Sequence, residues 1–98
     1  MAGDPTEVAS HVYKTILEND RVRVLSGKLS PGDTTVMHTH PDHVAVVLGD
    51  CSVQFTTGAG ETVEVSLKAG DAIFVDAGDH STQNTGDTTL EGILIELK

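Results

Sequence analysis

Residues 32–50 read GDTTVMHTHPDHVAVVLGD and hold three of the five histidines of the chain. One residue separates His38 from His40, and side chains alternate across a strand, so both imidazoles should point to the same face. That spacing suits two ligands of one metal ion. After the bend expected at Pro41 and Asp42, the next strand begins with His43, which supplies a candidate third ligand.

A further histidine lies in residues 70–84, which read GDAIFVDAGDHSTQN. His80 follows a turn at residues 76–79, and a strand lying beside that of His38 would deliver it to the same cavity. The candidate metal ligands are therefore His38, His40, His43 and His80. His11 stands apart from them, and we expect it to be an ordinary surface residue.

The chain has the periodicity of strands, interrupted at close intervals by Gly, Pro and Asp. This pattern predicts strands at residues 12–17, 21–29, 35–40, 43–48, 51–56, 61–67, 72–75, 79–84 and 89–97, and no helix after residue 20. So many short strands favour an antiparallel sandwich or barrel, in which closure removes exposed edges. We predict an all-β protein with one barrel domain at residues 11–98, preceded by residues 1–10 as a loose arm or an added edge strand.

The two histidine stretches resemble the two motifs of the cupin superfamily, whose members are β-barrels. The first family motif reads Gly, five residues, His-x-His, three or four residues, Glu, six residues, Gly, and Gly32, His38 and His40 fit it. His43 stands where the family usually has Glu, one residue early. Either His43 or Asp42 is therefore a candidate for that ligand position.

The second family motif reads Gly, five residues, Pro-x-Gly, two residues, His, three residues, Asn. This chain offers Gly70, Gly78, His80 and Asn84, with Asp76 in place of the Pro and one residue before His80 instead of two. The likeness covers most of residues 20–97. It implies a small single-domain cupin, a jelly-roll-like antiparallel barrel, whose histidines hold a metal.

Imidazole ligands favour Fe, Ni, Cu or Zn over Mg or Ca, which prefer oxygen ligands. Four imidazoles would close a tetrahedral zinc site, whereas six-coordinate Fe(II) would keep two positions for dioxygen and a substrate atom. We therefore expect one divalent transition metal, with Fe as the first choice and Ni, Zn, Mn or Cu as alternatives. Because imidazole binds metal in its neutral form, binding should fail below about pH 6.5.

The resemblance to all-histidine cupins that cleave thiols, diketones or phenolic compounds with oxygen implies a mononuclear non-haem dioxygenase acting on a small organic substrate. Two alternatives stay open: a non-catalytic barrel that binds or senses a small ligand, and a metal-dependent isomerase or lyase. Basic residues for anionic substrates are few, which disfavours the last. We expect a small apolar pocket lined by Val36, Ala45, Val47, Val53 and Phe55.

The chain is acidic, with 15 Asp and Glu against 6 Lys and Arg and a formal charge of −9. Such a charge repels phosphates and anionic head groups, so we expect no nucleic-acid or membrane partner. The start of the chain does not read as a signal peptide and the lone Cys51 cannot form an internal disulfide, so we expect a cytoplasmic protein. The last strand is apolar on both faces, which favours a homodimer.

Overall fold

The structure is a computed structural model that describes residues 2–98. Within these residues it has one short helix and nine strands: α1 (Pro5–Val8), β1 (Tyr13–Glu18), β2 (Val22–Leu29), β3 (His38–His40), β4 (His43–Val47), β5 (Cys51–Thr57), β6 (Thr62–Leu67), β7 (Ala72–Val75), β8 (Gly78–Asn84) and β9 (Leu90–Leu97). The strand pairings are antiparallel, which confirms the predicted all-β class. Each predicted strand is present, with bounds within one residue except at the third.

The third strand begins at His38, three residues later than predicted. Thr34 and Thr35 already bond to β8, through an isolated bridge from Thr34 and a 2.9 Å bond from Thr35 N to Thr82 O. Val36 and Met37 then lie exposed. The carbonyl oxygen of Val36 bonds the His38 ring, so it is turned away from the sheet ladder.

Residues 2–10 were predicted to be a loose arm or an added edge strand. They contain the short helix α1 instead. Asp4 caps a helical turn by accepting a 2.9 Å bond from Thr6 N, and Pro5 occupies the first helical position, where its missing N–H is not needed. Ala9 is fully buried and belongs to the core. Met1 lies outside the described residues.

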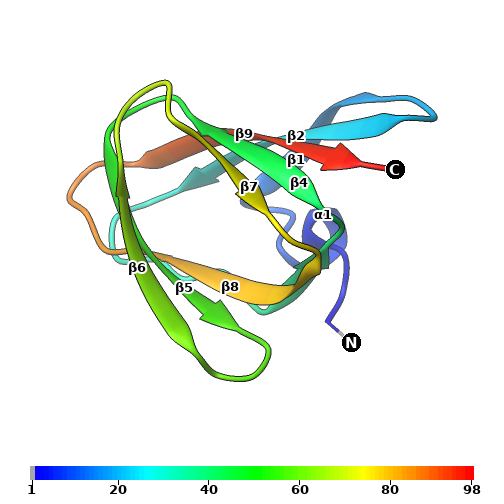
Figure 1. Cartoon of the computed structure of the whole chain (residues 1–98). Coiled ribbons are helices and arrows are strands. Elements are labelled where there is room, and N and C mark those ends of the chain that lie inside the picture. The colour runs from blue at the N-terminus through cyan, green and yellow to red at the C-terminus, as the bar shows by residue number, and fades with distance from the viewer. Residues whose placement is uncertain (1) are drawn as a thin grey trace.

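The strands form a five-stranded sheet in the order β1-β2-β9-β4-β7 and a four-stranded sheet in the order β3-β8-β5-β6. Figure 1 shows the two sheets facing each other, with the chain passing repeatedly between them. Strands that follow each other in the sequence therefore lie on opposite walls, except for the hairpins β1–β2 and β5–β6. His40 and His43, three positions apart, end up on different sheets.

The core lies between the sheets. One row of the five-stranded sheet runs through Leu25, Leu94, Ala45 and Ile73, of which Leu25 is fully buried. The alternate row, here called the outer row, consists of Leu17, Val24, Ile95, Val44 and Phe74. Phe74 in this row is 58% exposed because it points away from the core. Among residues 2–98, no helix has the length and apolar character needed to cross a membrane.

Candidate metal centre

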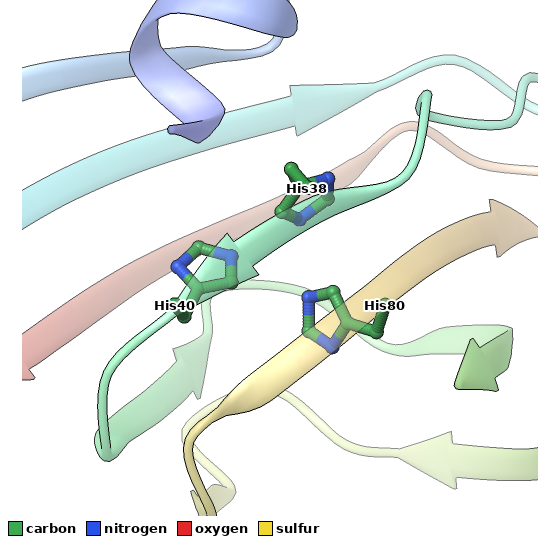
Figure 2. A group of neighbouring side chains, drawn as sticks. All are labelled: His38, His40 and His80. Atoms are coloured by element: carbon green, nitrogen blue, oxygen red, sulfur yellow. The ribbon is translucent and has the colours of Figure 1, made fainter. Parts of the chain in front are cut away.

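His38, His40 and His80 gather on the inner face of the four-stranded sheet. His38 and His40 lie on β3, and the register places His38 directly opposite His80 on β8. Residues directly opposite on antiparallel strands share a face, which brings the three rings together. Figure 2 shows the rings of His38, His40 and His80 turned toward one another from the two neighbouring strands.

The three histidines each offer one nitrogen, and these nitrogens lie within 4.8 Å of one another. Two metal–nitrogen bonds of about 2.1 Å span at most about 4.2 Å end to end, so small side-chain rotations close the remaining gap. His38 is fully buried and 3% of His40 is exposed. The group could therefore hold one metal ion.

The Nε2 atoms of His38, His40 and His80 are buried and have no hydrogen-bond partner within residues 2–98. A buried polar atom without a partner costs about 1–3 kcal/mol, so three such atoms facing one another need an explanation. A shared metal ion satisfies all three at once. This observation fits the residues to a transition metal with imidazole ligands.

Hydrogen bonds select the ring nitrogen that is free to bind. The Nδ1 atom of His38 lies 2.8 Å from Val36 O, and that of His43 lies 2.9 Å from Pro41 O. Because a carbonyl oxygen only accepts, each Nδ1 must carry the proton and donate. The lone pair of the neutral ring then resides on Nε2, as metal binding requires.

His43 faces the group from the other sheet. It is almost completely buried, and its ring centroid lies 4.6 Å from that of His40 and 6.2 Å from that of His80. It lies outside the group of three whose nitrogens are within 4.8 Å. Its role as a fourth ligand stays a prediction. The fold brings all four predicted histidines to one end of the space between the sheets, whereas His11 is exposed and remote from them in the sequence.

The family model described as the cupin domain matches residues 24–96, which is most of the chain. The chain belongs to the cupin family. The two family motifs thus contain His38, His40 and His80, the three histidines of this cupin that could hold a metal ion. No curated protein matches the chain.

Several solved structures share this architecture. A cupin domain from Bordetella pertussis Tohama I is 28% identical, with a TM-score of 0.80, and the match covers 89% of this chain and 92% of that one. A protein with a double-stranded β-helix domain from Klebsiella pneumoniae is 21% identical, with a TM-score of 0.71, over 88% of this chain and 75% of that one. A cupin family protein from Methanocaldococcus jannaschii is 17% identical, with a TM-score of 0.69, over 88% and 78%.

Burial keeps the metal-site rings of this cupin neutral when no metal is bound. It lowers the pKa of His38 to about 4, although the bond to Val36 O acts in the opposite direction. Burial and the neighbouring histidines lower the pKa of His80 to about 3. Burial also lowers the pKa of His43. At neutral pH these three rings are therefore unprotonated and ready to bind metal.

Asp42, the alternative to His43 in the family's Glu position, faces away from the histidines. It is exposed, and its Oδ1 accepts a 2.7 Å bond from Ala77 N, which ties the β3–β4 bend to the turn before β8. Asn84 is likewise structural, because its amide donates to Leu29 O and Thr88 O at 2.9 Å and 2.8 Å. These hydrogen bonds occupy Asp42 and Asn84 with backbone groups, so imidazoles are the candidate metal ligands.

Sequence analysis missed two residues of the site. Tyr13 packs edge-on against His38 and His40, with centroid distances of 5.1 Å and 5.7 Å. Burial raises the pKa of Tyr13 to about 12, so its hydroxyl stays protonated. Glu96 lies 2.6 Å from His40 Nδ1 through Oε2. Glu96 could have been recognised from the sequence, because it is an acidic residue at an inward position of the otherwise apolar strand β9.

A cavity of about 80 Å³ adjoins the histidines between the two sheets. Four of the five predicted pocket residues line it, namely Ala45, Val47, Val53 and Phe55. Val36 does not, because it is 51% exposed on the segment before β3. His43, His80, Tyr13 and Thr82 are among the polar residues of its wall, and Phe55 stacks on His80 with centroids 5.7 Å apart.

Proposed function

We propose that this cupin is a mononuclear metal-dependent oxygenase that acts on a small, uncharged organic molecule. The observation that carries the proposal is the set of three unpartnered Nε2 atoms beside an apolar cavity. His38, His40 and His80 would hold the metal, and His43 would complete the set from the opposite sheet. An iron ion in this site would supply a redox-active Lewis acid.

The chain's own residues would bind and orient the substrate. The cavity wall is built mainly from aliphatic side chains of both sheets, so apolar contact supplies the binding free energy. Among the described lining residues the one lysine, Lys28, is exposed. An anionic group in the apolar part of the cavity, away from the metal, would leave its charge unpaired, which costs several kcal/mol. The Tyr13 hydroxyl, protonated at neutral pH, would donate a hydrogen bond to a substrate oxygen.

The size of the cavity limits the part of the substrate that it can enclose. Its volume of about 80 Å³ is smaller than the roughly 150 Å³ of an engineered apolar cavity that binds benzene. A short aliphatic chain or the edge of a ring fits without rearrangement. We therefore expect the polar, metal-binding end of the substrate to face the histidines and a small apolar end to enter the cavity.

The metal content of protein purified anaerobically without chelator tests the proposal directly. Elemental analysis should show near-stoichiometric iron in the wild type, none in His40→Ala, and an unchanged amount in the control His11→Ala. Oxygen uptake with uncharged thiol, diketone and phenolic compounds then tests turnover. Tightly held zinc or nickel would favour a hydrolytic, isomerising or sensory barrel, and no metal after reconstitution would refute the metal site.

We also propose that a second copy of the chain covers the outer row. This row crosses all five strands of one sheet with apolar side chains, although the whole chain carries a charge of −9. Two copies related by a twofold axis would bury the apolar side chains of this row against one another. The cytoplasmic location stays a prediction.

A further inference from the structure

Glu96 is a buried carboxylate inside the barrel, near the end of β9. Only 2% of it is exposed, and the register places it between Arg23 on β2 and His43 on β4, in one inward row. An ionised carboxylate in such a place costs several kcal/mol unless it is paired. Glu96 therefore needs hydrogen-bonding or charged partners inside the barrel.

Each carboxylate oxygen of Glu96 has its own partner. Oε2 lies 2.6 Å from His40 Nδ1, and Oε1 accepts a 2.7 Å bond from Arg23 Nε. The guanidinium of Arg23 is always charged, so its partner Glu96 is the carboxylate and accepts at both oxygens. His40 Nδ1 therefore carries the proton and donates it to Oε2, and His40 Nε2 is left for a metal.

Arg23 in turn is held by the N-terminal segment, residues 3–9. Its two terminal nitrogens lie 2.9 Å and 3.2 Å from the carboxylate oxygens of Asp4, the residue that caps α1. The same segment bonds directly to β3, because Gly3 O accepts a 2.9 Å bond from Thr39 N, between the two histidines. A continuous series of contacts therefore joins His40, Glu96, Arg23 and Asp4.

We propose that Glu96 is a positioning residue of the metal site: it holds His40 in the tautomer and orientation that aim Nε2 at the metal, while Arg23 and Asp4 hold Glu96. Glu96 belongs to one sheet and His40 to the other, so their bond also sets the distance between the walls at the site. This role rests on the metal binding proposed above. It makes the N-terminal segment part of the site, which the family match at residues 24–96 leaves out.

The variant Glu96→Gln removes the charge and keeps the shape of the side chain. A neutral amide oxygen accepts a weaker bond from Nδ1 and makes His40 a poorer electron donor. Loss of a partner of this kind typically lowers metal affinity by about 10–100-fold. The carboxylate also stabilises the more highly charged metal, so its removal should shift the Fe(III)/Fe(II) midpoint potential to more positive values.

Anaerobic Fe(II) titration and potentiometry of the full chain test this role. We expect Glu96→Gln to bind Fe(II) about 10–100-fold more weakly than the wild type with a more positive potential. The matched control Glu91→Gln lies on the outward side of β9, opposite Lys28, and should match the wild type in both measurements. Asp4 is the last residue in the series of contacts from His40. Asp4→Asn should also weaken Fe(II) binding, but by a smaller factor than Glu96→Gln.

The outcomes separate this role from the proposed function. Wild-type affinity and potential in Glu96→Gln would overturn the positioning role alone, whereas a wild type that binds no Fe(II) would overturn both. Circular dichroism shows whether each variant is folded. If Glu96→Gln does not fold, Asp4→Asn decides: Fe(II) affinity and potential equal to those of the wild type would count against the role, and a parallel shift in both would support it.

Discussion

His38 and His80 lie directly opposite each other on β3 and β8, with ring centroids 4.7 Å apart and ring planes at 85°. Two imidazolium charges at this distance repel, and burial removes the water that would screen them. The metal-free site is therefore stable only with both rings neutral. This requirement connects the pH dependence of stability to the geometry of the site.

The metal-free protein should lose stability as the pH falls below about 6.5, the ordinary histidine pKa. The folded-state pKa is about 4 for His38 and about 3 for His80. Between these values and 6.5 the unfolded chain binds more protons than the folded one, so the free energy of unfolding decreases with decreasing pH. The slope should approach about 1.4 kcal/mol per pH unit for each histidine.

Urea unfolding in the presence of a chelator at several pH values between 7 and 4.5 measures this slope. The variant His80→Gln should show a shallower slope than the wild type, and His11→Gln an unchanged one. Equal free energies of unfolding at pH 7 and pH 5 would show that the buried rings do not control stability.

Truncation of the core should destabilise the barrel far more than truncation of its surface. Leu25 is fully buried in the cluster that also contains Tyr13 and Leu29, so Leu25→Ala should cost about 2–5 kcal/mol through lost burial and the cavity left behind. The control Ile16→Ala removes a side chain that is 53% exposed and should stay within about 0.5 kcal/mol. Denaturant unfolding measures the loss of unfolding free energy in both variants. A similar loss in Leu25→Ala and Ile16→Ala would contradict the placement of the core.

The cavity should bind small apolar molecules independently of the metal. Xenon is a suitable probe, because dry apolar cavities take it up. NMR shifts on xenon addition should appear at residues such as Val53 and be lost in Ala45→Leu, whose larger side chain fills the cavity. Fe(II) affinity should be retained in that variant. The control Val44→Leu points outward from the same strand, and loss of the xenon response there would contradict the assignment of faces.

A charge in the outer row should disrupt the proposed dimer. Phe74 is 58% exposed and lies in register with Val44, so Phe74→Lys would place a charge within the contact. Light scattering should show a dimer for the wild type and a monomer for this variant. Val63→Lys alters an equally accessible side chain on the other sheet, with 55% exposed, and should leave the mass unchanged. A monomeric wild type would refute the dimer.

Local sequence patterns were sufficient to predict the strands and to place His38 and His40 on the same face of one strand. Turn residues and the two-residue alternation are properties of a few neighbouring positions, and they placed the strand bounds correctly over almost all of the barrel. The one-residue gap between His38 and His40 similarly puts both rings on one face in any strand. Residues 2–10 were misjudged because the single helical turn depends on one cap, Asp4, and on packing of Ala9 into the core.

The remaining features depend on which strands become neighbours. Strand period and motif spacing are local, so the all-β class and the cupin spacing of the histidines can be predicted from the sequence alone. Three relationships follow from the folding of the two sheets: His80 faces His38, His43 approaches the other histidines from the opposite sheet, and Glu96 pairs with both His40 and Arg23. These contacts join residues up to 73 positions apart, and no local periodicity encodes the register that brings them together.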